Sequence, residues 1–187
     1  MLGITDLKTG VAIDLQGEPY IVLSYQHSKQ GRSGAVMRTR LRNLKSNAVI
    51  DLTFKGGDKF EEAFLDRRSC SYLYQEGNNF SFMNSQNFEQ FSLTSEEVGS
   101  KSAFLKEGSE VQILFYDDKP VSIELPIKME LLITHTEPGV KGDTAQGGSK
   151  PAILETGASI TVPLFVKIGD LIRVNTQEGT YVERVKQ

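Results

Sequence analysis

The chain has 187 residues, of which 39% are hydrophobic and 24% charged, with 21 Lys and Arg against 24 Asp and Glu and a net charge of −3. This length suits one ordinary domain or two to three small ones, and no apolar run approaches the ~20 residues that a membrane helix needs. The N-terminus lacks a secretory pattern, and the single cysteine, Cys70, excludes an internal disulfide framework and a multi-cysteine zinc site, so we expect a cytoplasmic protein with no membrane partner.

Short β-strands are predicted through the first third of the chain. Apolar runs at residues 11–15, 20–25 and 48–54 have the length and the β-branched and aromatic content of strands, with turn-forming residues between them. A further run at residues 37–42 alternates apolar side chains with arginines, and this period of two puts all the arginines on one face. The strands predict a small antiparallel domain over residues 1–64.

A second group of strands follows. Residues 70–74 and 80–83 flank a hairpin turn, and another hairpin ends the group. Between the hairpins, the sequence TSEE has the spacing of a capping box, which predicts one short helix from Ser95 to about Leu105. This group predicts a second domain over residues 65–127.

A third group of strands completes the chain. Residues 128–135 read as a strand, and residues 137–151 as a long polar loop. Further strands are expected at residues 158–162, 171–175 and 181–185. The third domain is therefore predicted over residues 128–187, and the fold class is all-β, with three small β-barrel domains and one short helix in the second.

The charge is unevenly distributed along the chain. Residues 1–18 have a net charge of −2, residues 19–50 carry six bases and no acid, residues 51–127 have a net charge of −7, and residues 128–187 are neutral. A basic segment of this length without a carboxylate indicates an anionic partner. The alternative is a solvated basic face with no partner.

The basic segment contains a candidate contact residue. Gly31 and Gly34 bracket Arg32, which places this arginine at the tip of a hairpin loop, away from the core. A guanidinium group is a planar fork that pairs with phosphates and stacks on bases. A supporting basic face is predicted behind the tip, formed by Lys29, Arg38, Arg40 and Arg42.

Signatures of catalysis are weak in this sequence. His27 and His135 are the two histidines, and neither has a nearby nucleophile or acid in a triad arrangement. Cys70 reads as a core residue, and the acidic pairs, such as Glu61-Glu62, are sequence neighbours whose side chains do not face each other. We therefore expect a binding protein with no catalytic residue, no metal site and no cofactor.

A glycine-rich stretch has part of the spacing of a phosphate-binding loop. Gly142 and Gly147 satisfy the G-x-x-x-x-G spacing, but Gly148 stands where the phosphate-binding lysine belongs and Pro151 excludes the helix that should follow. What remains is a loop whose amides and hydroxyls could meet nucleic acid, or that makes no contact.

The sequence resembles the elongation factor P family over nearly its whole length. The strongest segment is similar to the C-terminal signature of that family and reads GGSKPAILETGASITVPLFVKIGD, from Gly147 to Asp170. Shorter matches, in chain order, are TDLKTG, KQGRSGAV followed by RTRLRNL, YLYQEGNNFSFM, PGVKGDT and EGTYVERV. Motifs of this extent and in this order make the resemblance specific.

The resemblance implies a shape and a function. It implies an L-shaped, tRNA-sized protein with an N-terminal SH3-like (KOW-type) barrel followed by two OB-folds. Members of the family bind the 70S ribosome between the peptidyl (P) and exit (E) sites when synthesis stalls at consecutive prolines, where they stabilise the P-site peptidyl-tRNA and stimulate peptide-bond formation. Because proline is a rigid and poor reactant, holding the CCA end of the tRNA restores the geometry of attack. The factor itself does no covalent chemistry.

The resemblance also implies roles for particular residues. Arg32 falls on the loop-tip position that the family directs at the CCA end. Tyr181 and Arg184 match C-terminal positions that face ribosomal or tRNA backbone. The loop that approaches the mRNA at the E-site codon is matched by Gly142, Asp143 and Thr144.

The loop tip departs from the commonest family pattern. Many members carry there a lysine that is extended by an amine group, in a Pro-Gly-Lys-Gly setting, whereas this chain reads Gln30-Gly31-Arg32-Ser33. Arginine-tipped members carry rhamnose on the guanidinium, added by an arginine-modifying glycosyltransferase, or work unmodified, and the sequence leaves both open. Lys29, at the shoulder of the loop, is the less favoured target. We expect a monomer.

Two alternative functions stay open at this point. The first is the elongation-factor-P-like paralogue, which the intact loop from Gly142 to Thr144 disfavours. The second is a general OB-fold protein that binds single-stranded nucleic acid through exposed aromatic rings. The aromatic residues lie largely in the acidic middle segment, where a polyanion would be repelled, and include Phe80, Phe82, Phe88 and Phe91.

Overall fold

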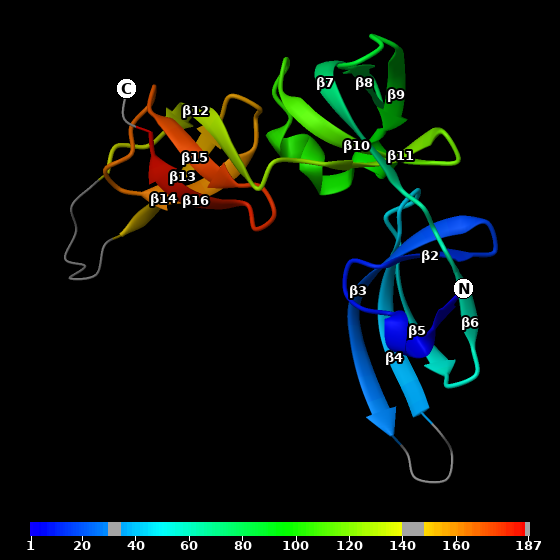
Figure 1. Cartoon of the computed structure of the whole chain (residues 1–187). Coiled ribbons are helices and arrows are strands. Elements are labelled where there is room, and N and C mark those ends of the chain that lie inside the picture. Colours follow the sequence, from blue (N-terminus) through cyan, green and yellow to red (C-terminus); the bar gives the residue numbers. More distant parts are fainter. Residues whose placement is uncertain (30–34, 140–147, 186–187) are drawn as a thin grey trace.

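A computed structural model describes residues 1–29, 35–139 and 148–185. These residues form three β-sheets in chain order. The sheets are arranged as an L, with the middle sheet at the corner, the N-terminal sheet in one arm and the C-terminal sheet in the other (Figure 1). The predicted all-β class and L-shape are confirmed. None of the helices in these ranges combines the length and the apolar content of a membrane span.

The N-terminal sheet has six strands in the order β1-β6-β2-β3-β4-β5. The strands are β1 (Leu2–Gly3), β2 (Ala12–Leu15), β3 (Glu18–Lys29), β4 (Ala35–Asn43), β5 (Val49–Lys55) and β6 (Lys59–Glu62). A 3-10 turn, η1 (Ile4–Asp6), follows β1. The sequence does not predict β1 and β6, because strands this short show no clear alternation. The buried core of the sheet comprises Ile4, Leu7, Ile13, Val22, Met37, Leu41 and Phe60.

The middle sheet has five strands in the order β11-β10-β7-β8-β9. The strands are β7 (Asp66–Glu76), β8 (Asn79–Asn84), β9 (Gln90–Thr94), β10 (Glu110–Tyr116) and β11 (Lys119–Glu124). An α-helix, α1 (Ser95–Val98), and a 3-10 helix, η3 (Gly99–Phe104), connect β9 to β10. Phe80 and Phe82, which the sequence offers as aromatic platforms, are buried in the core of this sheet.

The predicted helix from Ser95 to Leu105 is only partly correct. Thr94 caps it as the sequence indicates, because its hydroxyl oxygen accepts the backbone N–H of Glu97 and the Glu97 carboxylate accepts the backbone N–H of Thr94 at 2.7 Å. The α-helix nevertheless stops after one turn, since Gly99 has φ +61°, outside the helical range. The rest of the segment continues with the tighter 3-10 winding.

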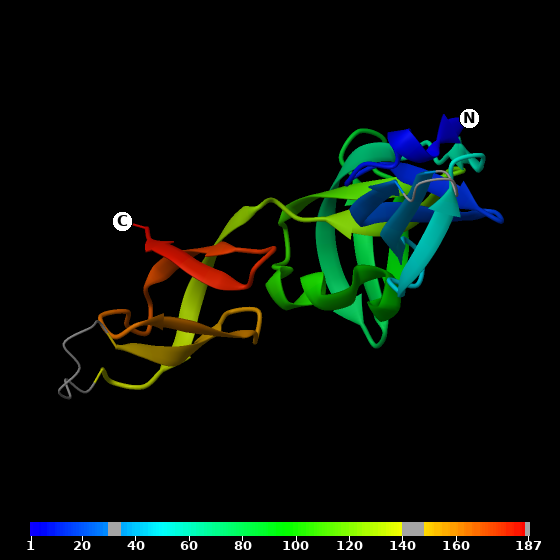
Figure 2. The same ribbon diagram turned by 90° about the horizontal axis from the view of Figure 1, so that it is seen from below.

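The C-terminal sheet has five strands in the order β14-β13-β12-β15-β16. They are β12 (Lys128–Thr136), β13 (Ser149–Leu154), β14 (Ser159–Pro163), β15 (Leu171–Asn175) and β16 (Thr180–Arg184). Strands β14 and β16, at the two ends of this order, lie against each other, so the sheet curls into a barrel. Figure 2 shows this domain set well apart from the N-terminal sheet.

Strand β13 begins inside the segment 137–151 that the sequence predicts as a loop. The presence of Pro151 argues against a strand there, because proline cannot donate to a β-ladder. In the structure Pro151 lies beyond the last pair between β12 and β13, Thr136 with Ala152, so its missing N–H costs no bond to β12. The Thr136 hydroxyl donates to the Pro151 carbonyl at 2.8 Å and holds this end of the strand in place.

The N-terminal and middle sheets share an apolar joint. Its buried members are Leu44 from the N-terminal part and Leu114 and Val121 from the middle sheet. Polar contacts surround this cluster: the Asn47 side-chain amide donates to backbone carbonyls of α1, including that of Glu97 at 3.1 Å. The joint therefore fixes the angle at the corner of the L through both packing and hydrogen bonds.

The middle and C-terminal domains are joined by a side chain inserted from one into the other. Phe104, the last residue of η3, packs among the buried residues of the C-terminal sheet. Thr156 donates to the Ala103 carbonyl at 2.6 Å, and Lys106 forms an ion pair with Glu155 at 3.0 Å. This second joint holds the C-terminal arm in place.

Candidate nucleic-acid interface

Strands β3 and β4 form the long hairpin that carries the predicted basic face. Their pairs run from Tyr20 with Asn43 to Lys29 with Ala35, and the hairpin extends to the end of the N-terminal arm farthest from the other two sheets (Figure 1). Four of the predicted site residues lie outside the described residues: Arg32, Gly142, Asp143 and Thr144.

The burial pattern of β4 confirms the alternation that the sequence predicts. Met37, Thr39 and Leu41 are buried, whereas Arg38 and Arg40 between them are exposed. The sheet thus separates an apolar face, which packs on the N-terminal core, from a cationic face, which is open to solvent.

The arginines of β4 differ from the other described arginines in their pairing. Among residues 1–29, 35–139 and 148–185, no carboxylate lies within 4.0 Å of a guanidinium nitrogen of Arg38, Arg40 or Arg42. A carboxylate partner is present for Arg67, Arg68, Arg173 and Arg184. The β4 arginines therefore keep their charge and their donors available for an anion from outside.

An aromatic ring stands beside the exposed arginines. A cavity of about 400 Å³ lies across β3, β4 and β5, and its lining includes Arg38, Arg40, Tyr25 and Asp51. Tyr25 is 43% exposed, so its ring could stack on a base while a guanidinium pairs with the adjoining phosphate. The sequence reasoning missed Tyr25, although its position in the acid-free segment was a usable signal.

Arg42 lies in a different environment from the other two arginines. It pairs with Ile21 and Val49 near the joint with the middle domain and is half-buried. The pKa of Lys101 in η3 is lowered, first by burial and then by the positive charge of Arg42, which places the two cations near each other. Lys101 donates to the Ile123 carbonyl. Arg42 thus faces the joint, and Arg38 and Arg40 remain as the open part of the face.

The second predicted contact surface lies on β16. Arg184 is exposed, its guanidinium nitrogen lies 3.6 Å from the Asp170 carboxylate, and its guanidinium carbon lies 5.6 Å from the centroid of the Phe165 ring. Tyr181 is half-buried against the core of the same domain and lines a groove together with Phe165. The structure thus brings both predicted residues to the neighbourhood of Phe165, a residue that the sequence reasoning did not single out.

Groups with nucleophilic or metal-binding chemistry are not gathered into a site. Cys70 is buried, and burial raises the pKa of its thiol to about 11, so it is protonated at neutral pH and a weak nucleophile. His27 and His135 are exposed on separate strands, β3 and β12. In the parts of the chain that the structure describes, no three His, Cys, Asp or Glu side chains are grouped so as to hold a metal ion.

Three sequence profiles match consecutive parts of the chain. "Elongation factor P (EF-P) KOW-like domain" matches residues 4–60, "Elongation factor P (EF-P) OB domain" matches residues 65–123, and "Elongation factor P, C-terminal" matches residues 129–184. The first two profiles agree with the predicted order of a KOW-type domain followed by an OB domain, so that part of the predicted fold is confirmed.

Full-length relatives match the whole chain. "Elongation factor P" of Natranaerobius thermophilus is 45% identical over 186 residues, covering 100% of this chain and 99% of that protein. "Elongation factor P" of Dictyoglomus turgidum is 46% identical over 184 residues, covering 98% and 100%. A solved structure, "Eukaryotic translation initiation factor 5A from Methanococcus jannaschii", is 23% identical, covers 66% of this chain and 92% of its own, and superposes with a TM-score of 0.52, a likeness of fold.

Proposed function

Because the chain belongs to the elongation factor P family, we propose that this translation elongation factor binds the ribosome between the P and E sites and promotes peptide-bond formation at consecutive prolines. The observation that carries the proposal is the face of β4, where Arg38 and Arg40 are exposed. No described carboxylate lies within 4.0 Å of their guanidinium nitrogens, although Asp51 on β5 is the cross-strand neighbour of Arg40. Such a face can bind the phosphate backbone of the P-site peptidyl-tRNA through bidentate, charge-assisted hydrogen bonds.

The β3–β4 hairpin supports a directional role for this face. Arg38 and Arg40 stand on a strand that leads to the hairpin end, so a tRNA held along them would have its acceptor end near the loop that carries Arg32. We propose that Arg32 contacts the CCA end, with Lys29 as part of the supporting basic face. At the other arm, the loop from Gly142 to Thr144 would approach the mRNA near the E site.

The acidic middle domain supports one orientation of docking. Residues 51–127 carry a net charge of −7, against +6 for residues 19–50. A polyanion such as RNA is repelled by the acidic residues 51–127 and attracted by the basic residues 19–50. Charge complementarity of this kind favours one orientation of the bound protein over others. The joint residues Leu44 and Phe104 hold the three domains together, so orienting one arm also orients the other.

The proposed effect on rate is one of positioning. Holding a reactant in the geometry of attack removes part of the entropic barrier that a mobile reactant must cross. The chain supplies cations that hold the tRNA, and the reacting groups belong to the peptidyl-tRNA and its acceptor. A second RNA contact would come from Tyr181 and Arg184 on β16, and the factor would act as a cytoplasmic monomer without a cofactor.

The chemical state of Arg32 is part of the proposal. Either an arginine-modifying glycosyltransferase adds rhamnose to its guanidinium, or the bare guanidinium is the working group. Intact mass of the native protein, followed by peptide mapping of residues 29–38, distinguishes the two: a deoxyhexose addition on Arg32 identifies the modified form, and an unchanged mass identifies the bare one.

The test of the function is the Arg32→Ala variant in reconstituted translation. We expect normal folding, because the residue is predicted at a loop tip, and loss of the rescue of a Pro-Pro-Pro template. Arg67→Ala is the matched control, since it removes an arginine of the middle domain that pairs with Glu124 at 3.1 Å. Full rescue by Arg32→Ala would overturn the role of the loop.

A further inference from the structure

The N-terminal sheet, unlike the other two, is open between its end strands. In the middle sheet β9 lies against β11, and in the C-terminal sheet β14 lies against β16. Among the described residues, β5 pairs with β4 alone and has no comparable contact with β1 or β6 on its other side. An unpaired strand edge presents a row of backbone N–H and C=O groups that another strand can join.

The backbone of β5 alternates between groups that bond to β4 and groups that point away from it. The Asn43 N–H donates to the Ala48 carbonyl at 2.9 Å, directly before the first pair of the β4–β5 ladder. Bonded and non-bonded pairs alternate in an antiparallel ladder. The even-numbered residues of β5 therefore bond to β4, and the odd-numbered residues, such as Asp51 and Thr53, direct their N–H and C=O groups outward. The ladder runs in unbroken register, so these outward groups form a regular edge.

The turn after β5 occupies one end of this edge. The Lys55 N–H donates to the Asp58 carboxylate at 2.8 Å, and the Lys55 carbonyl accepts the Asp58 N–H at 2.9 Å. Because both outward groups of Lys55 are used, the free edge comprises residues 49–53. This length matches that of a short strand.

A groove of about 650 Å³ lies beside this edge, between β5 and β6, and is called here the β5–β6 groove. Its apolar lining residues are Leu15, Tyr20, Ile50, Leu52, Phe54 and Phe60. All of these except Phe60 are only partly buried, because no strand covers β5 on its outer side. The Phe54 ring packs edge-on against the Phe60 ring, with centroids 4.5 Å apart, so side chains cross the gap where the backbones do not pair.

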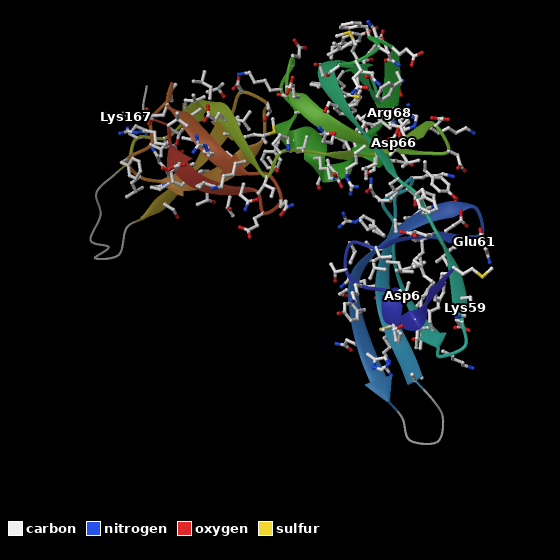
Figure 3. All side chains as sticks on the ribbon, viewed as in Figure 1. Asp6, Lys59, Glu61, Asp66, Arg68 and Lys167 are labelled. Atoms are coloured by element: carbon white, nitrogen blue, oxygen red, sulfur yellow. The ribbon has the colours of Figure 1, made fainter. Side chains whose placement is uncertain are left out.

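Carboxylates outnumber bases on the rim of the β5–β6 groove. Asp14, Asp58 and Glu61 line it, together with one base, Lys59. Figure 3 shows Lys59 and Glu61 on the N-terminal arm, along β6. Within the described ranges, no basic nitrogen lies within 4.0 Å of any of these three carboxylates. The rim is therefore opposite in sign to the arginine face of β4 and attracts a cationic partner.

We propose that an extended segment of a partner protein joins β5 at residues 49–53 as an additional strand. Backbone hydrogen bonds to Asp51 and Thr53 hold the segment, and its alternate apolar side chains enter the β5–β6 groove. Lysine or arginine side chains of the segment pair with the rim carboxylates. In strand addition of this kind the main-chain bonds supply affinity, and the sites for alternate side chains supply specificity. The site is separate from the arginine face proposed to bind tRNA.

Two other occupants fit the β5–β6 groove less well. Nucleic acid is a polyanion, and the rim carboxylates repel it. A second copy of the chain that paired through β5 about a two-fold axis would bring two identical acidic rims together, and like charges across paired strands are destabilising. A basic segment of another protein meets neither cost.

The test is fluorescence anisotropy of the full-length protein with a fluorescein-labelled peptide of about six residues, the length of a typical strand, in which lysine and valine alternate. A twin peptide that is methylated on its backbone nitrogens lacks the N–H donors of a strand. We expect it to bind at least about tenfold more weakly, the effect of losing two or more backbone hydrogen bonds. A second twin with glutamate in place of lysine should also bind more weakly, because the rim repels it.

Variants of the protein test the edge and the rim separately. Thr53→Pro removes an outward N–H and no bond to β4, a change that an edge strand tolerates. We expect binding about threefold to tenfold weaker, the effect of one lost backbone hydrogen bond, whereas Thr53→Val keeps the N–H and should bind like the native chain. Glu61→Gln should weaken binding about twofold to fivefold at low salt, as for an exposed ion pair. Glu107→Gln removes an exposed carboxylate of the middle domain and should change nothing.

The proposal is wrong if the methylated twin binds as tightly as the unmodified peptide, or if a Thr53→Pro variant with a native circular dichroism spectrum retains full binding. It is also wrong if the glutamate twin binds as tightly as the lysine peptide. Sedimentation of the chain alone as a dimer that Thr53→Pro dissociates would identify a second copy as the occupant and overturn the proposal. The assay contains neither ribosome nor RNA, so its result is separate from the Arg32→Ala rescue experiment.

Discussion

Substituting Phe104 by alanine tests whether the middle domain completes the core of the C-terminal domain. Phe104 is 8% exposed and packs among the buried residues of the C-terminal sheet. A buried aromatic side chain covers about 200 Å², which at about 25 cal/mol per Å² gives an upper bound of about 5 kcal/mol. Core Phe→Ala substitutions cost about 3–5 kcal/mol. Because Phe104 keeps 8% of its surface exposed, we expect a loss near the lower figure, about 3 kcal/mol.

Scanning calorimetry of the full chain measures this loss. In a domain of about 60–100 residues each kcal/mol shifts the melting temperature by about 4–8 °C, so the transition of the C-terminal domain should fall by at least about 12 °C. The control is Phe88→Ala, which removes a ring of the middle domain that is largely exposed. A loss below about 1 kcal/mol, or an equal loss in the control, would refute the idea that Phe104 is part of the C-terminal core.

Two further predictions concern the arginine face and the joint at the corner of the L. Replacing Arg38 and Arg40 together by alanine should weaken tRNA binding and reduce the slope of log K against log salt concentration by about 1–2. Arg67→Ala is the control. An unchanged slope in a filter-binding assay would show that Arg38 and Arg40 contact no phosphate. Tyr116 donates to the Asp14 carboxylate, and this hydrogen bond, followed by burial, raises the pKa of Tyr116 from 10.0 to about 12. Because the folded-state pKa is raised, the stabilisation is complete below pH 10 and is lost as pH rises toward 12. Denaturant midpoints measured from pH 8 to 12 should fall more steeply for the native chain than for Tyr116→Phe, and parallel curves would contradict this assignment.

The net charge of −3 conceals the feature that bears most directly on function. As a mean it argues against nucleic-acid binding, but the structure places Arg38, Arg40 and Arg42 on the single strand β4. The structure also shows that a basic segment of sequence is not the same as a basic surface. Arg42 faces the joint near Lys101, whereas Arg38 is exposed to solvent. Period-two alternation predicts the face of a strand, but it does not predict which other domain covers part of that face.

Local pattern predicted the strands well where they are long. The alternation around Arg38 and Arg40 and the cap at Thr94 are properties of a few consecutive residues, and both were confirmed. Strands β1 and β6 escaped prediction because they are too short to show a period. The start of β13 escaped because Ser149, Lys150 and Pro151 end a polar, glycine-rich stretch that is typical of a loop.

The sequence by itself determined the all-β class, the division into three groups of strands, the basic hairpin and the family resemblance, because each depends on the order of neighbouring residues. Only the tertiary structure decided that Phe104 belongs to the core of another domain and that Phe165 and Tyr181 share one groove. It also decided that the described arginines of β4 have no carboxylate partner, whereas Arg184 pairs with Asp170. The physical reason is that burial and pairing are set by contacts between residues far apart in the chain, which no local period records.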